Sequence, residues 1–197
     1  MVKRIFDIIA ALAGLLVLSP LIILLCIIIP LDSKGSPFFC QKRVGRHNRD
    51  FSLYKFRTMR KDSDKAGLLT VGGKDSRITR IGYWLRKFKI DEIPQLINIL
   101  KGEMSVVGTR PEVRKYVNMY TPHQMQVLEV RPGLTDLASI KYVNENEILG
   151  QSSDPEKTYI EKIMPEKIEL NLQYIENQSI IYDIELIFKT FAAILKK

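Results

Sequence analysis

Two adjacent carboxylates are the side chains in this sequence best suited to chemistry. Asp91 and Glu92 precede an apolar stripe at helical spacing, and Pro94 is tolerated only in a first helical turn. The pair is therefore expected at a helix N-terminus, where acids are common because they complement the helix dipole. The same position favours an ionised, nucleophilic carboxylate and can bind phosphate oxygens. The pair is either a helix-capping feature or part of a phosphate-handling site.

Basic side chains suited to phosphate binding occur on both sides of the pair. The candidates are Lys55, Arg57, Arg86 and Arg110. Lys55 and Arg57 are expected on one face of a strand, because residues 51–59 alternate apolar and polar side chains. Taken singly, each of the four is more often a solvated surface residue. Together with the carboxylates they indicate an anionic substrate.

A divalent metal is compatible with the same carboxylates. Mg²⁺ usually takes one or two acidic side chains together with phosphate oxygens of a substrate. Asp91 and Glu92 are therefore candidate Mg²⁺ ligands as well as candidate catalytic residues. Carboxylates, cations and a metal in one place suggest phosphoryl transfer.

The elements that must position these residues fit one compact domain with a membrane segment. The chain has 197 residues, of which 46% are hydrophobic and 26% charged, and this composition excludes a disordered or collagen-like chain. Two cysteines provide no disulfide framework. We expect an α+β, mainly helical fold with few short strands. Its expected segments are a membrane helix at 1–33, a domain at 34–197, strands near 36–43 and 51–59, helices from 78 and 93, and an amphipathic, interfacial or core-packed helix at about 180–197.

An apolar run of 24 residues without a charge extends from Ile8 to Leu31, which is long enough to cross a bilayer. Ser19-Pro20 lies near its middle, and proline kinks or breaks a helix. A spanning helix and a re-entrant helix broken at Ser19 and Pro20 both remain open on this pattern. In the re-entrant form, the Ser19 hydroxyl is expected to bond the carbonyl that Pro20 leaves without a donor.

The net charge of +8 is concentrated directly after the apolar run. Nine basic residues and one acid, Asp50, lie between Lys34 and Lys61. Basic residues on both flanks of an apolar segment favour the cytoplasmic side for both ends. The patch also permits a different class of protein, a membrane-anchored module that binds nucleic acid or anionic lipid. That alternative leaves Asp91 and Glu92 without a role.

Seven short segments, in this order, carry a resemblance that covers nearly the whole chain. They are Lys3–Asp7, Ser19-Pro20, Lys55–Met59, Asp91–Leu96, Lys101–Ser105, Val107–Pro111 and Arg131–Thr135. Together they resemble the small monotopic phosphoglycosyl transferases of the bacterial sugar transferase family. The chain departs from the usual family pattern at Thr109, where many members have proline, and at Asp136-Leu137, where many have Gly-Trp. The sugar is therefore not implied by the resemblance.

The resemblance implies a transferase of substituted phosphate groups. Such an enzyme moves a sugar 1-phosphate from a nucleotide diphosphate sugar, typically a UDP-sugar, to polyprenyl (undecaprenyl) phosphate, and initiates bacterial surface glycan or glycoconjugate synthesis. By this analogy Asp91 is the nucleophile that forms a covalent phosphosugar enzyme, Glu92 is its partner, and Mg²⁺ assists. Substrate and phosphate binding is then expected from Lys55, Arg57, Arg86, Arg110 and Arg131.

The resemblance also implies location and partners. A re-entrant helix would keep both flanks on the cytoplasmic face of the bacterial inner membrane, in contact with membrane lipids. The expected partners are the sugar donor and the lipid phosphate acceptor, and nucleic acid is not expected. A homo-oligomer or contacts with downstream glycosyltransferases are compatible with the sequence. A scaffold of a glycan-assembly complex that has lost activity is the remaining alternative.

Overall fold

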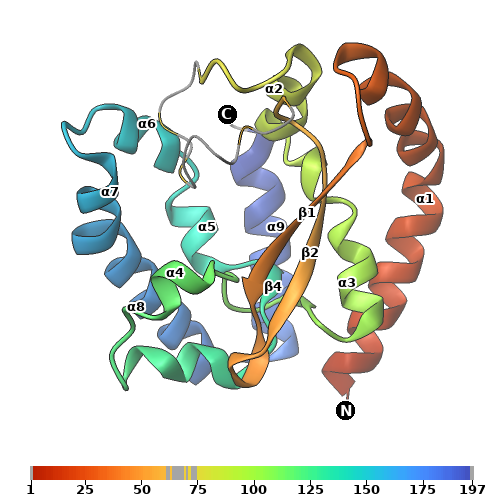
Figure 1. Ribbon diagram of the computed structural model, residues 1–197. Coiled ribbons are helices and arrows are strands. Elements are labelled where there is room, and N and C mark those ends of the chain that lie inside the picture. Colours follow the sequence, from red (N-terminus) through yellow and green to blue (C-terminus); the bar gives the residue numbers. More distant parts are fainter. Residues whose placement is uncertain (1, 61–62, 64–68, 70, 72–74, 196–197) are drawn as a thin grey trace.

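The computed structural model describes residues 2–60, 63, 69, 71 and 75–195, so most of the polar stretch 61–74 lies outside the described residues. It confirms a mainly helical fold with few short strands (Figure 1). In chain order the main elements are α1 (Val2–Asp32), β1 (Phe38–Val44), β2 (Asp50–Phe56), α2 (Arg80–Lys87), α3 (Gln95–Lys101), β3 (Ser105–Val107), α4 (Arg114–Val117), β4 (Gly133–Thr135), α5 (Leu137–Lys141), α6 (Glu145–Gly150), α7 (Pro155–Thr158), α8 (Met164–Glu176) and α9 (Ile180–Leu195). Short 3₁₀ turns at Arg46–Asn48, Ile90–Glu92 and Gln124–Glu129 and a π turn at Tyr159–Ile163 connect them.

Two small sheets replace the single large sheet of an ordinary α/β domain. β1 and β2 form an antiparallel hairpin in which Phe38 is opposite Phe56, close to the strands predicted from alternation. β3 and β4 pair in parallel. A Cβ atom on Gly108, just after β3, would lie 2.4 Å from the Arg131 carbonyl oxygen, so only glycine permits this close approach of the two segments.

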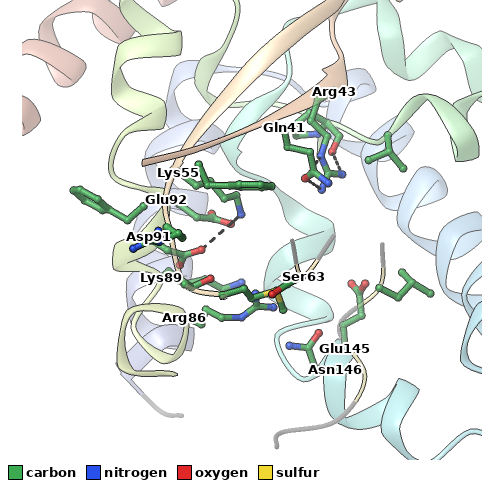
Figure 2. A pocket seen from close by; sticks show the side chains of 18 of the residues that line it. Gln41, Arg43, Lys55, Ser63, Arg86, Lys89, Asp91, Glu92, Glu145 and Asn146 are labelled. Carbon is green, nitrogen blue, oxygen red and sulfur yellow. Dashed lines mark hydrogen bonds and ion pairs between the residues drawn. The ribbon is translucent and has the colours of Figure 1, made fainter. Parts of the chain in front are cut away.

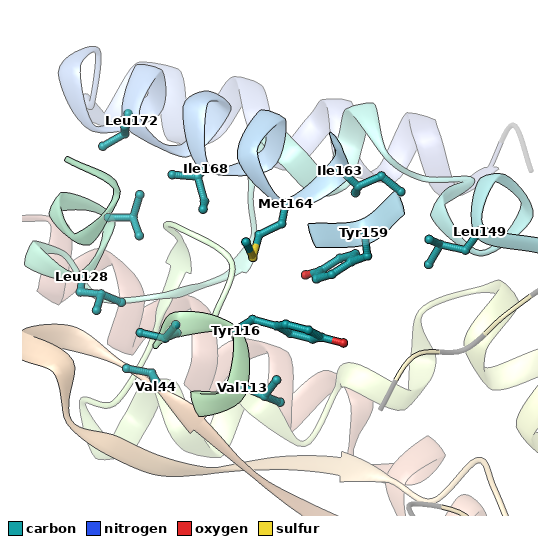
Figure 3. Close-up of a cluster of buried hydrophobic side chains, with 12 residues drawn as sticks. Val44, Val113, Tyr116, Leu128, Leu149, Tyr159, Ile163, Met164, Ile168 and Leu172 are labelled. Carbon is teal, nitrogen blue, oxygen red and sulfur yellow. The ribbon is translucent and has the colours of Figure 1, made fainter. Parts of the chain in front are cut away.

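The largest buried cluster joins Val44, the last residue of β1, to α8 and the turns around it (Figure 3). Its buried members are Val44, Val113, Tyr116, Val117, Val127, Leu128, Leu149, Tyr159, Ile163, Met164, Ile168 and Leu172. A second cluster packs α3 and β2 against α1, with Ala11 and Ile99 fully buried. The hairpin is thus fixed between the α8 side of the molecule and the apolar N-terminal helix.

The expected interruption of the first helix at Ser19-Pro20 is absent, because α1 continues through Pro20 and Pro30 to Asp32, and the re-entrant arrangement stays a prediction. The Ser19 hydroxyl donates to the Leu16 carbonyl at 2.8 Å, as expected. That carbonyl is the one that Pro20, which has no N–H, leaves without its usual helical donor. The serine therefore limits the cost of the proline, and helical geometry persists (Figure 1).

Both ends of α1 are bonded to the same domain. Near its N-terminus, the buried Asp7 carboxylate accepts bonds from the Ser105 hydroxyl and the Val106 amide, each at 2.9 Å. At its C-terminus, Asp32 accepts the Ile81 amide of α2 at 3.0 Å. Among the described residues, α1 is the helix long and apolar enough to cross a membrane. Its outward face is apolar and exposed, with Ile5, Ile9, Leu12, Leu16, Val17, Ile23, Leu24, Ile27 and Leu31.

The amphipathic C-terminal helix is confirmed as α9, which ends at Leu195, while Lys196 and Lys197 lie outside the described residues. Leu186 and Asp183 are buried, and Asp183 pairs with Lys3 of α1. The opposite face exposes Ile181, Ile184, Phe188, Phe191 and Leu195. One end of α1 is therefore bonded to a second helix with an exposed apolar face. The division of the chain at residue 33 stays a prediction.

Candidate active site

The carboxylate pair lies in the turn that leads into α3. Asp91 and Glu92 end a 3₁₀ turn that starts at Ile90, and Pro94 directly precedes the first residue of α3, as the sequence predicts. Lys89, the residue before the turn, has a φ of 57°, in the left-handed region that non-glycine residues rarely adopt. Both carboxylates are buried, with exposed fractions of 6% and 7%. The chain thus presents two acids inside the fold rather than on its surface.

Glu92 is bound by two cations from distant parts of the chain, Lys55 and Arg110, and Figure 2 shows Lys55 beside it. Its Oε1 atom lies 2.8 Å from Lys55 Nζ of β2 and 2.8 Å from Arg110 Nη2. Lys55 Nζ is also 3.8 Å from Asp91 Oδ2. By contrast, Asp91 Oδ1 is buried and accepts no hydrogen bond from any described residue. The two neighbouring acids therefore have different environments, and Asp91 is the one with an available oxygen.

The pKa values of the two acids move in opposite directions. Burial raises the pKa of Asp91, and the Glu92 charge adds to this rise while the Lys55 charge opposes it. Burial also acts to raise the pKa of Glu92, but the Arg110 and Lys55 charges outweigh it and hold that pKa well below its ordinary value. Glu92 is therefore a permanent anion at neutral pH that neutralises two cations. Such a divergence within one pair is typical of functional sites.

Replacement of Glu92 by glutamine is expected to lower stability. Lys55 and Arg110 would then face each other without the carboxylate, and uncompensated charges in a partly buried site cost about 2 to 3 kcal/mol of the free energy of unfolding. The Glu92 charge contributes its full stabilisation above the ordinary carboxylate pKa, and this stabilisation is lost as the pH falls through the lowered pKa of Glu92. The difference in stability between the parent and Glu92→Gln should therefore shrink in acid.

The apparent melting temperature in detergent, followed against pH, measures this effect. Glu185→Gln is the control, because it removes an exposed pair with Lys189 and should leave the melting temperature unchanged. A Glu92→Gln variant as stable as the parent at neutral pH would mean that the carboxylate does not compensate the two cations.

A cavity of about 680 Å³ opens beside the pair, large enough for a nucleotide-sized ligand. Figure 2 shows Lys55, Asp91, Glu92 and Arg86 on one side, with Glu145 and Asn146 of α6 across from them. Gln41 and Arg43 of β1 form a further part of the wall. Lys55 and Arg86 thus lie with the two acids at one end of the cavity, and Glu145 and Asn146 lie at the other, where Glu145 is paired with Lys167.

Comparison with known proteins identifies the family of this chain. The sequence model of the family described as "Bacterial sugar transferase" matches residues 1–197. The chain belongs to the bacterial sugar transferase family. The resemblance seen in the seven segments is therefore confirmed.

Relatives in this family have informative names. The chain is 39% identical over 197 residues to the UDP-N-acetylgalactosamine-undecaprenyl-phosphate N-acetylgalactosaminephosphotransferase of Aeromonas hydrophila, covering 98% of this chain and 44% of that protein. It is 37% identical over 195 residues to the undecaprenyl-phosphate glucose phosphotransferase of Komagataeibacter xylinus, covering 95% of this chain and 35% of that protein. The chain spans less than half the length of these two relatives. It is also 38% identical over 202 residues to the exopolysaccharide production protein PSS of Rhizobium leguminosarum bv. phaseoli, covering 99% of this chain and 96% of that protein.

The structure brings most of the predicted family site together, but not all of it. Lys55, Arg86 and Arg110 line the cavity. Arg57 also borders it, yet its guanidinium donates to the Ser33 carbonyl and, at 2.9 Å, to the Lys34 carbonyl, just beyond the end of α1. In the described structure, Arg57 thus ties the end of β2 to the segment that follows α1.

Arg131, predicted to bind substrate, lies away from the cavity. Its Nε atom donates to the Gly102 carbonyl at 2.9 Å, and the residue is not among those that line the cavity. The carbonyl belongs to the C-terminal end of α3, where a cation is favourable. The segment Arg131–Thr135 therefore holds β4 and α3 in place, and its motif alone did not distinguish this from a role at the site.

Several cavity residues were not predicted from the sequence. Lys89 could have been found from its position two residues before Asp91. No short sequence pattern marks the others as cavity residues. They reach the cavity from β1 (Arg43), from the residue after α5 (Tyr142) and from α6 (Glu145 and Asn146). Their presence depends on how the hairpin and the C-terminal helices pack.

The two carboxylates of the site fit a metal ion that takes its remaining ligands from the substrate. The described residues contain no group of three or more acids, histidines or cysteines close enough to enclose an ion. Mg²⁺ commonly uses one or two carboxylates and completes its shell with water and phosphate oxygens. Asp91 Oδ1, which has no hydrogen-bond partner within the described part of the chain, suits this role, whereas Glu92 is bound by Lys55 and Arg110. Any metal here would depend chiefly on Asp91.

Proposed function

We propose that this chain transfers a sugar 1-phosphate from a UDP-sugar to undecaprenyl phosphate, as the first step of a surface polysaccharide or glycoconjugate. The names of two relatives support the acceptor and the reaction class, and the name of a third supports a role in exopolysaccharide production. The observation that carries the proposal is the buried Asp91, whose Oδ1 atom has no hydrogen-bond partner among the described residues, beside a Glu92 that is bound by two cations.

The geometry supports a two-step reaction through Asp91. An Asp91 oxygen attacks the sugar-bearing phosphorus of the donor, the bond to the bridging oxygen breaks, and nucleoside monophosphate leaves with that oxygen. The lipid phosphate oxygen then attacks the same phosphorus, which releases the carboxylate and forms the lipid diphosphate sugar. Burial of Asp91 limits the access of water to the intermediate.

Lys55, Arg110 and Glu92 have supporting roles in this proposal. Lys55 and Arg110 lie where they can stabilise negative charge on the transferred phosphate, and Glu92 keeps both in place. Mg²⁺, held by Asp91 and the donor phosphates, would supply further positive charge that neutralises the diphosphate. Arg86 on the adjacent cavity wall is a further phosphate-binding candidate.

Release of nucleoside monophosphate tests this function. The detergent-solubilised chain is incubated with a panel of UDP-sugars, including UDP-N-acetylgalactosamine and UDP-glucose, with and without undecaprenyl phosphate. We expect release limited to about one equivalent of enzyme without acceptor, and continuous turnover with it. A chelator should stop turnover and added Mg²⁺ should restore it. Absence of release with every donor would favour an inactive scaffold, and turnover that resists chelation would exclude the metal.

The membrane arrangement that we favour is one in which α1 enters a single leaflet. At ~1.5 Å per residue, α1 is ~46 Å long, yet Asp7 and Asp32 near its two ends are bonded to the same domain. If α1 crossed the bilayer, its two ends would lie on opposite sides of the membrane. The domain that binds both ends would then have to place some of its polar groups in hydrocarbon, which is costly. Both ends are therefore proposed to lie on the cytoplasmic face of the plasma membrane, with the exposed apolar faces of α1 and α9 in lipid.

Protease protection of terminal tags checks this topology. In sealed right-side-out vesicles, tags at the N-terminus and at the C-terminus should both be protected and should be digested only after detergent is added. A membrane protein with a known external tag is the control. Digestion of the N-terminal tag in intact vesicles would establish a spanning helix instead.

A further inference from the structure

The cavity has two sides that differ in their relation to the membrane helix. On one side, Ser36, Phe38 and Phe39 follow the C-terminal end of α1. On the other, Glu145 and Asn146 of α6 line the wall together with residues of α5 and α8. In the membrane arrangement proposed above, an acceptor in the lipid would approach the first side, next to α1. The second side is then left for a ligand that arrives from water.

Glu145 presents a fixed carboxylate on this second side. Its Oε2 atom lies 2.8 Å from Lys167 Nζ of α8, and the side chains of Glu145 and Lys167 are 24% and 12% exposed. The ammonium group of Lys167 lies 5.4 Å from the centre of the Tyr159 ring, which restrains it further. Within the described part of the chain, the other oxygen of Glu145 has no hydrogen-bond partner. The carboxylate is thus oriented, with one acceptor available to a ligand.

This wall carries less positive charge than the other end of the cavity. Glu145 is paired with Lys167, which also lines the cavity, whereas Lys55 and Arg110 share the single carboxylate of Glu92. A carboxylate oxygen next to an amide matches neighbouring hydroxyl groups, since the acid accepts their protons and the amide both donates and accepts. Acidic side chains bind the ribose hydroxyls of dinucleotides in the same way.

The two ends of the cavity are close enough to serve one ligand. The Glu92 charge raises the pKa of Arg110 most, burial opposes it, and the charges of Asp136 and Glu145 add to the rise. Glu145 therefore acts electrostatically on the same guanidinium that binds Glu92. Figure 2 shows the Asn146 amide directed across the cavity towards the side that carries Arg86. A ligand with its diphosphate at Arg110 would place its neutral part along this wall.

We propose that Glu145 and Asn146 form a subsite for neighbouring hydroxyl groups of the sugar donor, either those of the nucleotide ribose or those of the transferred sugar. This rests on the proposed function, because it takes a nucleoside diphosphate sugar as the ligand. In this role Glu145 accepts hydrogen bonds through the oxygen that Lys167 does not occupy. Lys167 positions the carboxylate through its ion pair.

Binding and turnover of Glu145→Gln and Asn146→Ala test the subsite. Glutamine keeps the shape of Glu145 and an oxygen for Lys167 but loses the charge, so the fold should be preserved and is checked by the melting temperature. Glu147→Gln, on the same helix but exposed and outside the cavity, is the matched control. The probes are UDP-N-acetylgalactosamine, UDP-glucose and UMP, titrated into the solubilised full chain by calorimetry.

We expect both subsite variants to weaken UDP-sugar binding by about tenfold or more and to lower kcat/KM for the donor equally, with the KM for undecaprenyl phosphate unchanged. Weaker UMP binding in the variants assigns the hydroxyls to the ribose, and unchanged UMP binding with weaker UDP-sugar binding assigns them to the sugar. Parent-like affinity of both variants for every probe, with the parent itself binding and turning over, would overturn the subsite alone. A parent chain that binds none of the probes would overturn the proposed function and the subsite with it.

Discussion

Asp91→Asn should reduce sugar phosphate transfer by more than about a thousandfold while the protein still folds and associates with membranes. Asparagine has nearly the same size as aspartate but cannot act as an anionic nucleophile. Among the described residues, Asp91 Oδ1 accepts no hydrogen bond and the carboxylate has a long contact of 3.8 Å with Lys55, so we expect its charge to contribute little to the fold. Lipid product formed per minute from the active UDP-sugar measures the effect.

The intermediate gives this prediction a second, independent measurement. The parent enzyme, mixed with donor and no acceptor, should gain the mass of one sugar phosphate on the peptide that contains Asp91, and Asp91→Asn should not. Glu92→Gln is the comparison variant, because it alters the neighbouring acid and leaves the nucleophile in place. A variant at Asp91 that still forms lipid product at near-parent rates would remove this residue from the role of nucleophile.

Gly82→Ala should disrupt the site from a distance. A Cβ atom at Gly82 of α2 would lie 2.0 Å from the Thr58 carbonyl oxygen and 2.8 Å from its Cα atom, and backbone cannot move aside as a side chain can. We expect a loss of about 2 to 3 kcal/mol of the free energy of unfolding, despite a helix-propensity gain of about 1 kcal/mol for alanine. Because α2 carries Arg86, turnover should fall together with stability.

Gly14→Ala is the matched control for this substitution. Gly14 also lies within a helix, so alanine brings the same gain in propensity. Its new Cβ would meet only the Leu96 side chain, at 3.1 Å, and that side chain can shift. We expect parent-like melting and activity within experimental error. If Gly82→Ala behaved like Gly14→Ala, α2 would not approach Thr58 as closely as the structure places it.

Much of the local structure could be predicted because short-range patterns determine it. Alternating side chains at 51–59 gave a strand that the structure places at Asp50–Phe56. Pro94 and the following apolar stripe placed the acids before a helix, and Gly102 ends that helix with a φ of 85°, as a C-cap glycine does. The proline at position 20 was misleading, since the Ser19 hydroxyl supplies the bond whose loss would have broken the helix.

The site itself was only partly predictable. Motifs identified Lys55, Arg110 and the two acids, but they grouped Arg57 and Arg131 with them. In the structure these two arginines donate to backbone carbonyls just beyond α1 and at the end of α3. A sequence motif does not distinguish residues that bind a ligand from residues that fix the position of a helix or strand. The distinction depends on where a side chain finds its partners.

The sequence by itself determined the chemistry available to this protein: an acid pair before a helix, cations for phosphate, and an apolar segment with basic flanks. Only the tertiary structure decided how the two acids differ. Glu92 contacts Lys55 from 37 positions earlier in the chain and Arg110 from 18 positions later, whereas Asp91 keeps an oxygen without a hydrogen-bond partner in the described structure. Periodicity and capping act within a few residues, but the pKa of a buried acid depends on the charges that the fold brings near it.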